Sequence, residues 1–510
     1  MNRILWADDE FDLLKPHVLF LNSRGYDVTM VSNGVDALDL LAKESFNLVM
    51  LDENMPGLSG LETLDRIKLR HPDLPVIMIT KSEEEDLMNQ AIGNRIADYL
   101  IKPVNPRQIL PALKKILGGK ELVEMQTSSD YREDFAKISS LVAEADSFED
   151  WFSIYKRLVD WEIRLEKSPM SEIMHLQKKD ADKNFSKFIK NNYRNALNGS
   201  RQFLMSPDIM TSRVIPPLNE GNKLFFIVID NFRLDQWRMI QPLLSDYFEI
   251  HEDLCCSILP TSTQYSRNAI FSGLMPLKIK ELYPSLWTHD DSDSGLNNNE
   301  EKLLSLLFER LRLNIDFNYF KINDNRSGEK FLQSMGKICV KPLNVVVLNF
   351  LDMMSHARTE LKMIRELAYS DAAYRSLTET WFRHSPAIDI FLKIAETGSS
   401  IILTTDHGTM RVENPLKISG VRELNSNLRY KTGHNIKFNS KDVFAIEKPE
   451  DVGLPAYHIS DTYIFACDND FFVYPNNLNH FVKYYSGTYQ HGGVSMEEMI
   501  IPLVTLTPKK

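Results

Sequence analysis

The sequence predicts an α/β protein in which two parallel-sheet domains flank a helical segment. Short apolar runs alternate with amphipathic stretches in residues 1–118, strand signals are missing from residues 119–205, and buried-strand runs return in residues 206–510. This alternation is typical of parallel sheets that are covered by helices. A chain of 510 residues is also too long for a single hydrophobic core. We therefore expect one domain at each end and a small helical bundle between them.

The overall composition argues against two broad classes of function. The formal net charge is -11, whereas sequence-independent binding of duplex nucleic acid needs a surplus of basic residues. The N-terminus reaches Asp8 and Asp9 before a signal-peptide apolar region could form, and no later apolar run is long enough to span a membrane. We expect a cytoplasmic protein without membrane insertion.

Four predicted strands in the first domain end in or next to polar residues. The strands are Arg3–Ala7, Leu48–Leu51, Val76–Thr80 and Asp98–Ile101, and the polar residues are Asp8, Asp9, Asp52, Thr80 and Lys102. Because the carboxyl ends of parallel strands meet at one edge, these side chains should converge. Three carboxylates can hold Mg²⁺ and make Asp52 an acceptor for phosphate, with Lys102 and the Thr80 hydroxyl bonding the added oxygens.

These motifs resemble those of response-regulator receiver domains over residues 1–118. The matching segments are Ala7-Asp8-Asp9-Glu10, Leu51-Asp52-Glu53-Asn54-Met55-Pro56-Gly57, Ile79-Thr80 and Tyr99-Leu100-Ile101-Lys102-Pro103. The resemblance implies a flavodoxin-like receiver fold, phosphorylation of Asp52 by a sensor histidine kinase, and a backbone carbonyl of Asn54 on Mg²⁺. It also implies that Thr80 and Tyr99 form the switch pair.

The middle segment, residues 119–205, is expected to be a helical bundle that links the two larger domains. Trp151, Tyr155, Leu158 and Trp161 are spaced three or four residues apart, which places them on one helix face. We interpret this aromatic stripe as core. Residues 205–222, with three prolines, predict an irregular entry into the next domain, and residues 290–301 predict a loop.

The last domain repeats the pattern of acids after strands. Strands are predicted at Leu224–Ile229, Val345–Phe350, Ile401–Thr404 and Tyr463–Ala466, and the first three lead into Asp230, Asp352 and Asp406. Ligands bind at this edge of open α/β sheets. Three unpaired carboxylates at one edge would repel each other unless cations neutralised them.

Histidines near these acids suggest two metal sites. Asp352 and His356 are four residues apart, so a helical turn would point both side chains at one ion. His491 could be the third ligand of this site. Asp230, Asp406 and His407 can form the second site, with a threonine hydroxyl between the two ions. Zinc accepts this mixture of ligands, and Mn²⁺ is also compatible. Two such ions can stabilise both oxygens of an in-line displacement at phosphorus.

The order of these residues resembles the alkaline phosphatase superfamily, and within it PglZ-domain proteins, over residues 206–508. The shared order is Asp, hydroxyl nucleophile, Asp-x-x-x-His, Asp-His and His. It implies two zinc ions, one on Asp352, His356 and His491, and the other on Asp230, Asp406, His407 and the nucleophile.

The nucleophile is predicted to be Thr263, because Pro260-Thr-Ser-Thr263 resembles the Pro-Thr-x-Thr pattern of nucleotide pyrophosphatases. The residues that follow differ from that family, so Thr261 and Ser262 stay open as alternatives. Lys431, His434, Arg411 and Arg267 could contact a substrate phosphate, but solvated surface positions are expected for all four.

The whole chain resembles response regulators of the PorX type, a family associated with type IX secretion and gliding. The resemblance implies dimerisation on phosphorylation, a phosphodiesterase acting on nucleotide or oligonucleotide phosphodiesters, and sigma-factor or secretion-system partners. The alternative is a phosphorylation-switched signalling scaffold whose metal domain is structural. Monoester versus diester preference and the natural substrate are not fixed by any motif.

Overall fold

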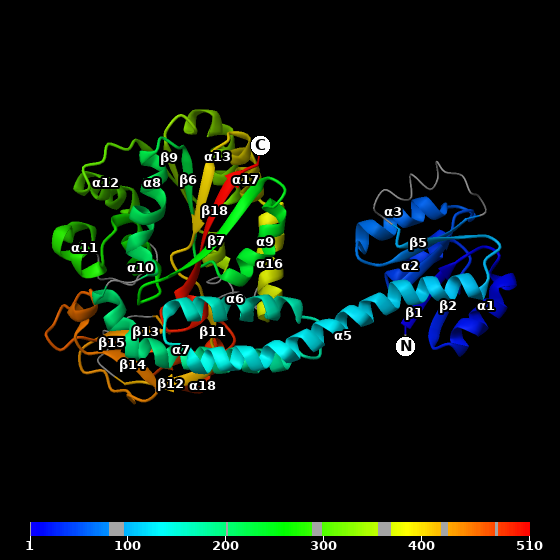
Figure 1. The fold of residues 1–510 in the computed structure, drawn as a ribbon, viewed down its shortest axis with the longest axis horizontal. Helices are drawn as coiled ribbons and strands as arrows, with labels where there is room; N and C mark the ends of the chain where they lie inside the picture. Colours follow the sequence, from blue (N-terminus) through cyan, green and yellow to red (C-terminus); the bar gives the residue numbers. More distant parts are fainter. Residues whose placement is uncertain are drawn as a thin grey trace. The chain divides into compact units, whose positions relative to one another are not determined.

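The protein forms two compact units, residues 1–131 and residues 132–510. A computed structural model describes residues 2–80, 96–199, 202–287, 298–354, 369–419, 427–474 and 478–509. Helix α5, Pro106–Glu144, contains the boundary between the units (Figure 1). None of the helices in these described ranges combines the length and the apolarity needed to cross a bilayer.

The first unit contains a five-stranded parallel sheet in the order β2-β1-β3-β4-β5. The strands are β1 Asn2–Ala7, β2 Tyr26–Val31, β3 Leu48–Asp52, β4 Val76–Thr80 and β5 Asp98–Ile101. Helices α1 Phe11–Ser23, α2 Gly34–Leu41 and α3 Gly60–Arg70 connect them, and α5 follows β5. The α/β fold is confirmed. Strand β2 was not predicted, because its residues are mostly half-buried and form no continuous apolar run.

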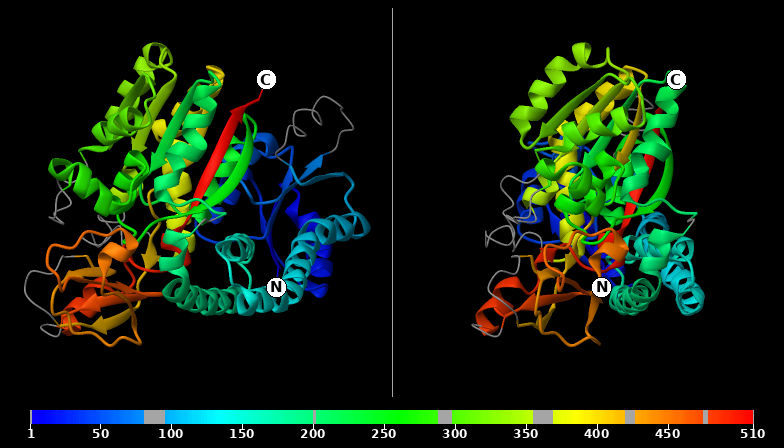
Figure 2. Two further views of the ribbon diagram at one scale, coloured as in Figure 1. Left: turned by 60° about the vertical axis from the view of Figure 1, so that its left-hand side comes forward. Right: turned by 90° about the vertical axis from the view of Figure 1, so that its left-hand side faces the viewer.

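The second unit is built on a six-stranded sheet in the order β7-β18-β10-β6-β9-β8. The strands are β6 Leu224–Ile229, β7 Phe248–Cys256, β8 Phe317–Ile322, β9 Leu343–Leu348, β10 Ser400–Thr404 and β18 Ile500–Pro508. Strand β18 is antiparallel to both of its neighbours, β10 and β7, and the pairs of β6, β8, β9 and β10 are parallel (Figure 2). The predicted α/β architecture of this unit is therefore also confirmed.

Helices and three small sheets surround the main sheet. The helices are α9 Leu234–Leu244, α10 Thr263–Ser272, α11 Pro276–Leu282, α12 Glu300–Arg310, α13 Asn325–Ile338, α16 Asp371–His384, α17 Pro386–Glu396, α18 Leu478–Tyr485 and α19 Met496–Met499. The small sheets pair β11 Met410–Arg411 with β17 Tyr489–Gln490, β12 Asn414–Lys417 with β16 Asp470–Val473, and β13 Tyr430–Gly433 and β14 Val443–Ile446 with β15 Thr462–Ala466. The predicted strand Tyr463–Ala466 thus belongs to a small sheet.

The helical middle segment packs as part of the second unit. It continues from α5 into α6, Phe148–Arg164, and α7, Ser171–Asn198. The predicted aromatic stripe is buried, and Trp151 meets Phe185 edge to face at a centroid distance of 5.3 Å. Along α7, the Asp182 carboxylate accepts a hydrogen bond from the backbone N–H of Met496 at 2.7 Å. The segment is therefore a bundle that is fused to the second unit.

One of the predicted loops is helical. Residues 205–222 contain the short helices η1 Ser206–Asp208, η2 Met210–Val214 and α8 Ile215–Asn219, and they bury Ile209, Met210 and Val214. The expectation of an irregular entry was wrong because these apolar side chains reach the core in spite of the prolines. The predicted loop 290–301 lies outside the described residues up to residue 297, but Glu300 begins α12 and is buried.

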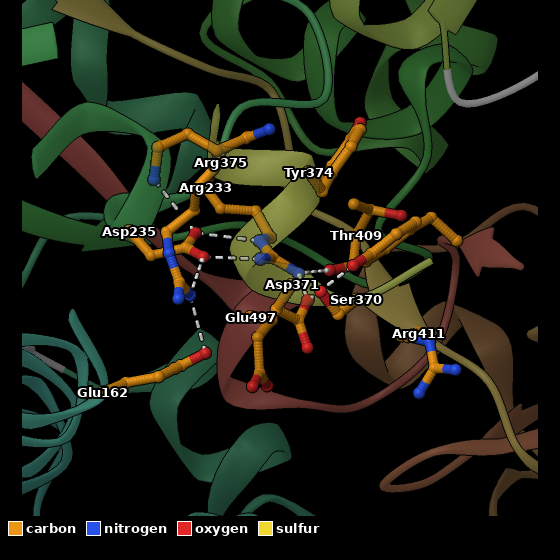
Figure 3. Close-up of polar contacts among 12 residues, drawn as sticks. Glu162, Arg233, Asp235, Ser370, Asp371, Tyr374, Arg375, Thr409, Arg411 and Glu497 are labelled. Atoms are coloured by element: carbon orange, nitrogen blue, oxygen red, sulfur yellow. Dashed lines mark hydrogen bonds and ion pairs between the residues drawn. The ribbon is translucent and has the colours of Figure 1, made fainter. Parts of the chain in front are cut away.

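A network of buried charges fastens the helical segment to the main-sheet helices (Figure 3). Arg233 donates to both oxygens of Asp235, at 2.9 and 2.5 Å, and to Asp371 at 2.8 Å. Arg375 bridges Asp235, at 3.3 Å, and Glu162 of α6, at 2.7 Å. The network therefore joins α6, α9 and α16 in one set of ion pairs.

The network makes stability depend on pH. Burial on its own would raise the pKa of Asp235, but the charges of Arg233 and Arg375 outweigh burial and hold that pKa below its ordinary value. A carboxyl group whose pKa is lower in the folded state stabilises the fold above its unfolded-state pKa of about 4. This stabilisation is lost as the pH falls through the folded-state value.

We predict that Asp235→Asn lowers the free energy of unfolding at pH 7 by about 3 kcal/mol, because it leaves buried guanidinium groups short of a counter-charge. The variant should also lose less stability than the wild type between pH 5 and pH 3. Urea unfolding at several pH values measures both effects. Asp246→Asn, at an exposed position, is the control and should match the wild type. Equal pH profiles for Asp235→Asn and the wild type would contradict the prediction.

Candidate active site

The carboxyl edge of the first unit's sheet gathers three acids and a lysine. Asp8 and Asp9 follow β1, Asp52 ends β3, and Lys102 follows β5. One carboxylate oxygen from each acid lies within 4.8 Å of the others. Lys102 Nζ lies 2.9 Å from Asp52 Oδ2 and 3.1 Å from Asp8 Oδ2. The convergence predicted from the strand ends is therefore present in the fold.

The electrostatics of this edge suit a bound cation. Asp52 Oδ1 is buried and accepts no hydrogen bond from any residue that the structure describes. Burial, together with the nearby charge of Asp8, raises the pKa of Asp52, although Lys102 opposes the shift. A hard divalent ion such as Mg²⁺ would satisfy the open oxygen and compensate the negative charge. Asp8, Asp9 and Asp52 fit such an ion.

The other predicted receiver residues, Thr80, Tyr99 and Asn54, differ in their exposure to solvent. Thr80 ends β4, which pairs with β3 through Asp52 and Ile79. Tyr99 lies in the edge strand β5 with 39% of its side chain exposed, and Asn54 is exposed after β3. Thr80 is thus near Asp52, whereas Tyr99 is open to solvent. Their switching roles stay predictions.

The main sheet of the second unit also carries acids at its carboxyl edge. Asp230 follows β6, Asp352 lies in helical residues 350–354 after β9, and Asp406 follows β10. These three strands are neighbours in the order β10-β6-β9. One ligand atom from each of Asp230, Asp406 and His407 lies within 4.8 Å of the others, and all three residues are buried.

Thr263 approaches this cluster from the first position of α10. Its Oγ1 lies 3.2 Å from His407 Nε2. His407 Nδ1 lies 3.0 Å from the carbonyl oxygen of Gly408, which can only accept, so Nδ1 carries the ring proton. Burial lowers the pKa of His407 to about 4, although Asp406 opposes the shift. The imidazole is therefore neutral at pH 7, with the Nε2 lone pair directed at the Thr263 hydroxyl.

His491 and Asp352 belong to the same region. The His491 ring stacks on His407 with a centroid distance of 4.2 Å, and its Nδ1 lies 3.1 Å from the carbonyl oxygen of Thr261. Burial and, to a smaller extent, the charge of Asp352 raise the pKa of Asp230, and the same charge partly opposes the lowering of the pKa of His407 by burial. The placing of Asp352 and His491 on one metal ion stays a prediction. His356, the remaining predicted ligand, lies outside the described residues.

The open alternatives for the nucleophile differ in their hydrogen bonds. Thr261 is fully buried, and its Oγ1 donates to the Gly493 carbonyl and accepts from the Gly492 N–H, both at 3.0 Å. Ser262 caps α10 without a side-chain hydrogen bond to the helix. The Thr261 hydroxyl thus holds the loop after His491, whereas the Thr263 hydroxyl lies beside His407.

The expectation of four solvated basic residues was wrong for two of them. Arg267 is 1% exposed and Lys431 is 2% exposed, while Arg411 and His434 are half-buried. Arg267 contacts the carboxylates of Asp230 and Asp406. Helix α10 is buried along most of its length, so a charged residue in it must find a partner inside. Arg267 is four residues after Thr263, and this helical spacing was the one sign in the sequence that both side chains face the same site.

The second cluster also fits a divalent ion. Asp230 Oδ1 is buried and accepts no hydrogen bond within the described ranges. Burial raises the pKa of Asp230 well above its ordinary value, and Arg267 compensates only part of this. Two carboxylates, an imidazole nitrogen and a hydroxyl oxygen form a donor set that zinc or Mn²⁺ accepts. The residues present therefore fit the predicted metal.

Gly408 is required by the packing of the loop that carries Asp406 and His407. Its N–H donates to the carbonyl oxygen of Glu498 at 3.1 Å. A Cβ at this position would overlap the carbonyl oxygen of Glu497. The glycine in Asp406-His407-Gly408 thus lets this loop lie against the segment that follows His491.

We predict that Gly408→Ala lowers the free energy of unfolding by about 3 kcal/mol, since neither backbone segment can move without breaking hydrogen bonds. Gly336→Ala in α13 is the matched control, because an added Cβ meets no atom within 4 Å there. It should be neutral or stabilising by up to about 1 kcal/mol, as alanine favours helix. Thermal and urea unfolding measure both variants. A Gly408→Ala protein as stable as the wild type would refute this account.

Curated relatives resemble about a quarter of the chain. The transcriptional regulatory protein CpxR of Escherichia coli K12 is 33% identical over 144 residues, which is 28% of this chain and 60% of that protein. A CpxR homologue of Haemophilus influenzae is 36% identical over 119 residues, 23% of this chain and 51% of that protein. The chain thus spans between 51% and 60% of the length of these two relatives.

Solved receiver domains are also similar to about a quarter of the chain. A response regulator receiver from Clostridium thermocellum is 29% identical, with a TM-score of 0.23, and the match covers 24% of this chain and 98% of that one. A CheY-like receiver from Methanospirillum hungatei gives 29% identity and a TM-score of 0.23, covering 24% of this chain and 97% of that one.

Three family profiles match successive parts of the chain. They are described as a response regulator receiver domain, residues 4–114, a PorX response regulator linker domain, residues 121–197, and a BREX system PglZ alkaline phosphatase-like domain, residues 209–506. The last profile covers more than half of the chain. The chain therefore belongs to the PglZ alkaline phosphatase-like family, as a response regulator with the PorX-like combination of receiver, linker and PglZ domain.

Proposed function

We propose that the second unit is a metal-dependent phosphodiesterase that is controlled by phosphorylation of Asp52. The observation that carries the proposal is the buried grouping of Asp230, Asp406 and His407, with the Thr263 hydroxyl 3.2 Å from His407 Nε2. The PglZ family belongs to the alkaline phosphatase superfamily, which supports hydrolysis of phosphoesters. The receiver implies a phosphodonor such as a sensor histidine kinase.

In the proposed reaction, Thr263 attacks the phosphorus of the substrate. Its hydroxyl loses a proton to solvent and forms a bond to phosphorus, while the bond to the leaving alkoxide breaks and that oxygen takes a proton from water. Water then hydrolyses the phosphothreonine and restores the hydroxyl. Helix α10 begins at Thr263, so the positive end of its dipole favours the phosphate oxygens at this hydroxyl.

The proposed ligands are shared between two zinc ions. Asp352, His356 and His491 would hold one, and Asp230, Asp406, His407 and Thr263 would hold the other. When bound, such ions supply positive charge that favours the threonine alkoxide and the negative charge developing on phosphate oxygens. In the receiver, Asp8, Asp9, Asp52 and the Asn54 carbonyl would hold Mg²⁺, with Thr80 and Tyr99 as the switch pair and Lys102 pairing with the phosphate.

The substrate class and the partners follow from the resemblance to PorX-type regulators. We propose nucleotide or oligonucleotide phosphodiesters as substrates, dimerisation on phosphorylation, and a cytoplasmic role in type IX secretion and gliding with sigma-factor or secretion-system partners. We also propose that the receiver, linker and PglZ parts divide at residues 1–118, 119–205 and 206–510.

We predict that Thr263→Val lowers turnover of bis-p-nitrophenyl phosphate by roughly 1000-fold or more, because it removes the attacking oxygen. Zinc content, measured by mass spectrometry, should fall by no more than one ion per chain, because the proposed ion on Asp352, His356 and His491 does not involve Thr263. Ser262→Ala is the matched control and should keep its activity, since its hydroxyl makes no capping bond. Bound zinc with turnover that does not depend on Thr263 would favour the signalling scaffold.

Phosphorylation gives a second test of the proposal. Wild-type protein treated with acetyl phosphate should double its mass in light scattering and change its turnover of the diester. Asp52→Ala should do neither, because the acceptor carboxylate is missing. Unchanged mass and equal activity of the two treated proteins would reject control by the receiver.

A further inference from the structure

Helix α10 carries two residues that face the metal cluster. Thr263 is the first residue of the helix, and Arg267 follows four residues later, on the same face. The whole stretch from Gln264 to Ser272 is buried. The guanidinium of Arg267 therefore cannot reach solvent, and its neighbours have to supply its counter-charges.

The contacts of Arg267 fall on the metal-site carboxylates. Its Nη2 pairs with Asp230 Oδ2 and lies 2.9 Å from Asp406 Oδ2, and its Nε lies 3.0 Å from the same Asp406 oxygen. On the other side, Nη1 lies 3.4 Å from Asn349 Oδ1 and 3.7 Å from Glu300 Oε1. One guanidinium thus ties together the ends of β6 and β10.

The two oxygens of the Asp230 and Asp406 carboxylates have different neighbours. In each residue Oδ2 contacts Arg267, and Oδ1 does not. Arg267 uses Oδ2 of Asp230, and Oδ1 of the same group accepts no hydrogen bond from the described residues. Asp406 Oδ1 accepts the N–H of His407 at 3.1 Å, which orients the carboxylate from its other end. Only Nε of Arg267 donates a hydrogen bond to Asp406 Oδ2, whereas Nη2 makes an ion-pair contact without hydrogen-bond geometry, so the second lone pair of this oxygen can face an ion.

The contacts of Arg267 leave a carboxylate oxygen for a metal ion. Asp230, Asp406 and Glu300 lie around Arg267, and the charge of Asp352 acts on Asp230. Lys321 lies 3.1 Å from Glu300 and is the second cation that pairs with these acids. Arg267 and Lys321 are thus shared among the carboxylates of Asp230, Asp406 and Glu300. Asp230 Oδ1 accepts no hydrogen bond within the described residues, so this oxygen is open to a divalent ion.

We propose that Arg267 is a positioning residue of the metal centre. It holds Asp230 and Asp406 by their Oδ2 atoms, so that Asp230 Oδ1 and His407 Nε2 converge where the Thr263 hydroxyl ends. This inference rests on the proposed function of the second unit. Because α10 carries both Thr263 and Arg267, the helix fixes the hydroxyl and the metal carboxylates relative to each other.

The test is zinc binding by full-length protein that has been stripped with a chelator. Arg267→Lys keeps the buried charge but cannot contact both carboxylates with a planar fork, and Arg267→Met removes the charge. We expect wild type to bind zinc in calorimetry, and Arg267→Lys to bind it roughly 10- to 100-fold more weakly. Arg267→Met should bind more weakly still, and saturating zinc should restore thermal stability to Arg267→Lys.

Arg310→Lys is the matched control. Arg310 is half-buried and donates to the carbonyl oxygen of Ser272 at the end of α10, at 2.5 Å, without touching an acid of the cluster. Its replacement should leave zinc affinity unchanged. A similar loss of affinity in Arg310→Lys would overturn the proposal, because any disturbance of α10 would then have the same effect.

Each remaining outcome separates this inference from the proposed function. Wild-type zinc affinity in Arg267→Lys, or tighter binding in Arg267→Met, would overturn the positioning role and leave the phosphodiesterase proposal intact. An Arg267→Lys protein that stays unfolded with saturating zinc would also overturn it. Weaker zinc binding together with a wild type that hydrolyses no diester would support the positioning role and reject the proposed reaction. A wild type that binds no zinc would end both.

Discussion

Negative charge buried at the carboxyl edge of a parallel sheet is the constraint on which the second unit depends. Asp230 and Asp406 lie at the ends of adjacent strands and are almost inaccessible to water. An unpaired buried carboxylate costs several kcal/mol, so the surrounding structure has to supply positive charge or hydrogen-bond donors. Arg267 supplies one fixed charge. The oxygen of Asp230 that it leaves open has a place for a further cation.

The receiver also gathers negative charge at the carboxyl edge of its sheet, but this edge is more exposed to solvent. Lys102 pairs with Asp8 and Asp52, as Arg267 pairs with the acids of the second unit. Asp9, however, is exposed, so the edge of that sheet stays accessible. An accessible edge suits a site that has to exchange an ion and accept a phosphoryl group from another protein. The acids of the second unit are enclosed instead, which suits a resident metal.

The helical segment contributes charges to the interior of the second unit. Glu162 joins the network of Arg375, and Lys178 lies 2.9 Å from Glu497, next to the loop that follows His491. These contacts explain why residues 132–198 form one compact unit with the PglZ part. A change in α6 or α7 would act on buried ion pairs and, through Glu497, on the loop that packs against Gly408.

The fold class and the polar residues at the ends of the strands could be predicted from the sequence alone. Continuous apolar runs marked β6, β9 and β10, and the acids after them had to meet because parallel strands end at one edge. The grouping of Asp230, Asp406 and His407 follows from that rule, although their roles stay predictions. Half-buried strands such as β2 lack this signal.

Which polar groups are buried together became clear only from the folded structure. Arg267 and Lys431 look like solvated residues in the sequence, since charged side chains usually are. Their burial depends on helices and small sheets that arrive from distant parts of the chain. The hydrogen bonds of Thr261 to Gly492 and Gly493 likewise join residues more than 200 positions apart. Local pattern determines an element and its faces, but the partner of a buried charge is fixed by long-range packing.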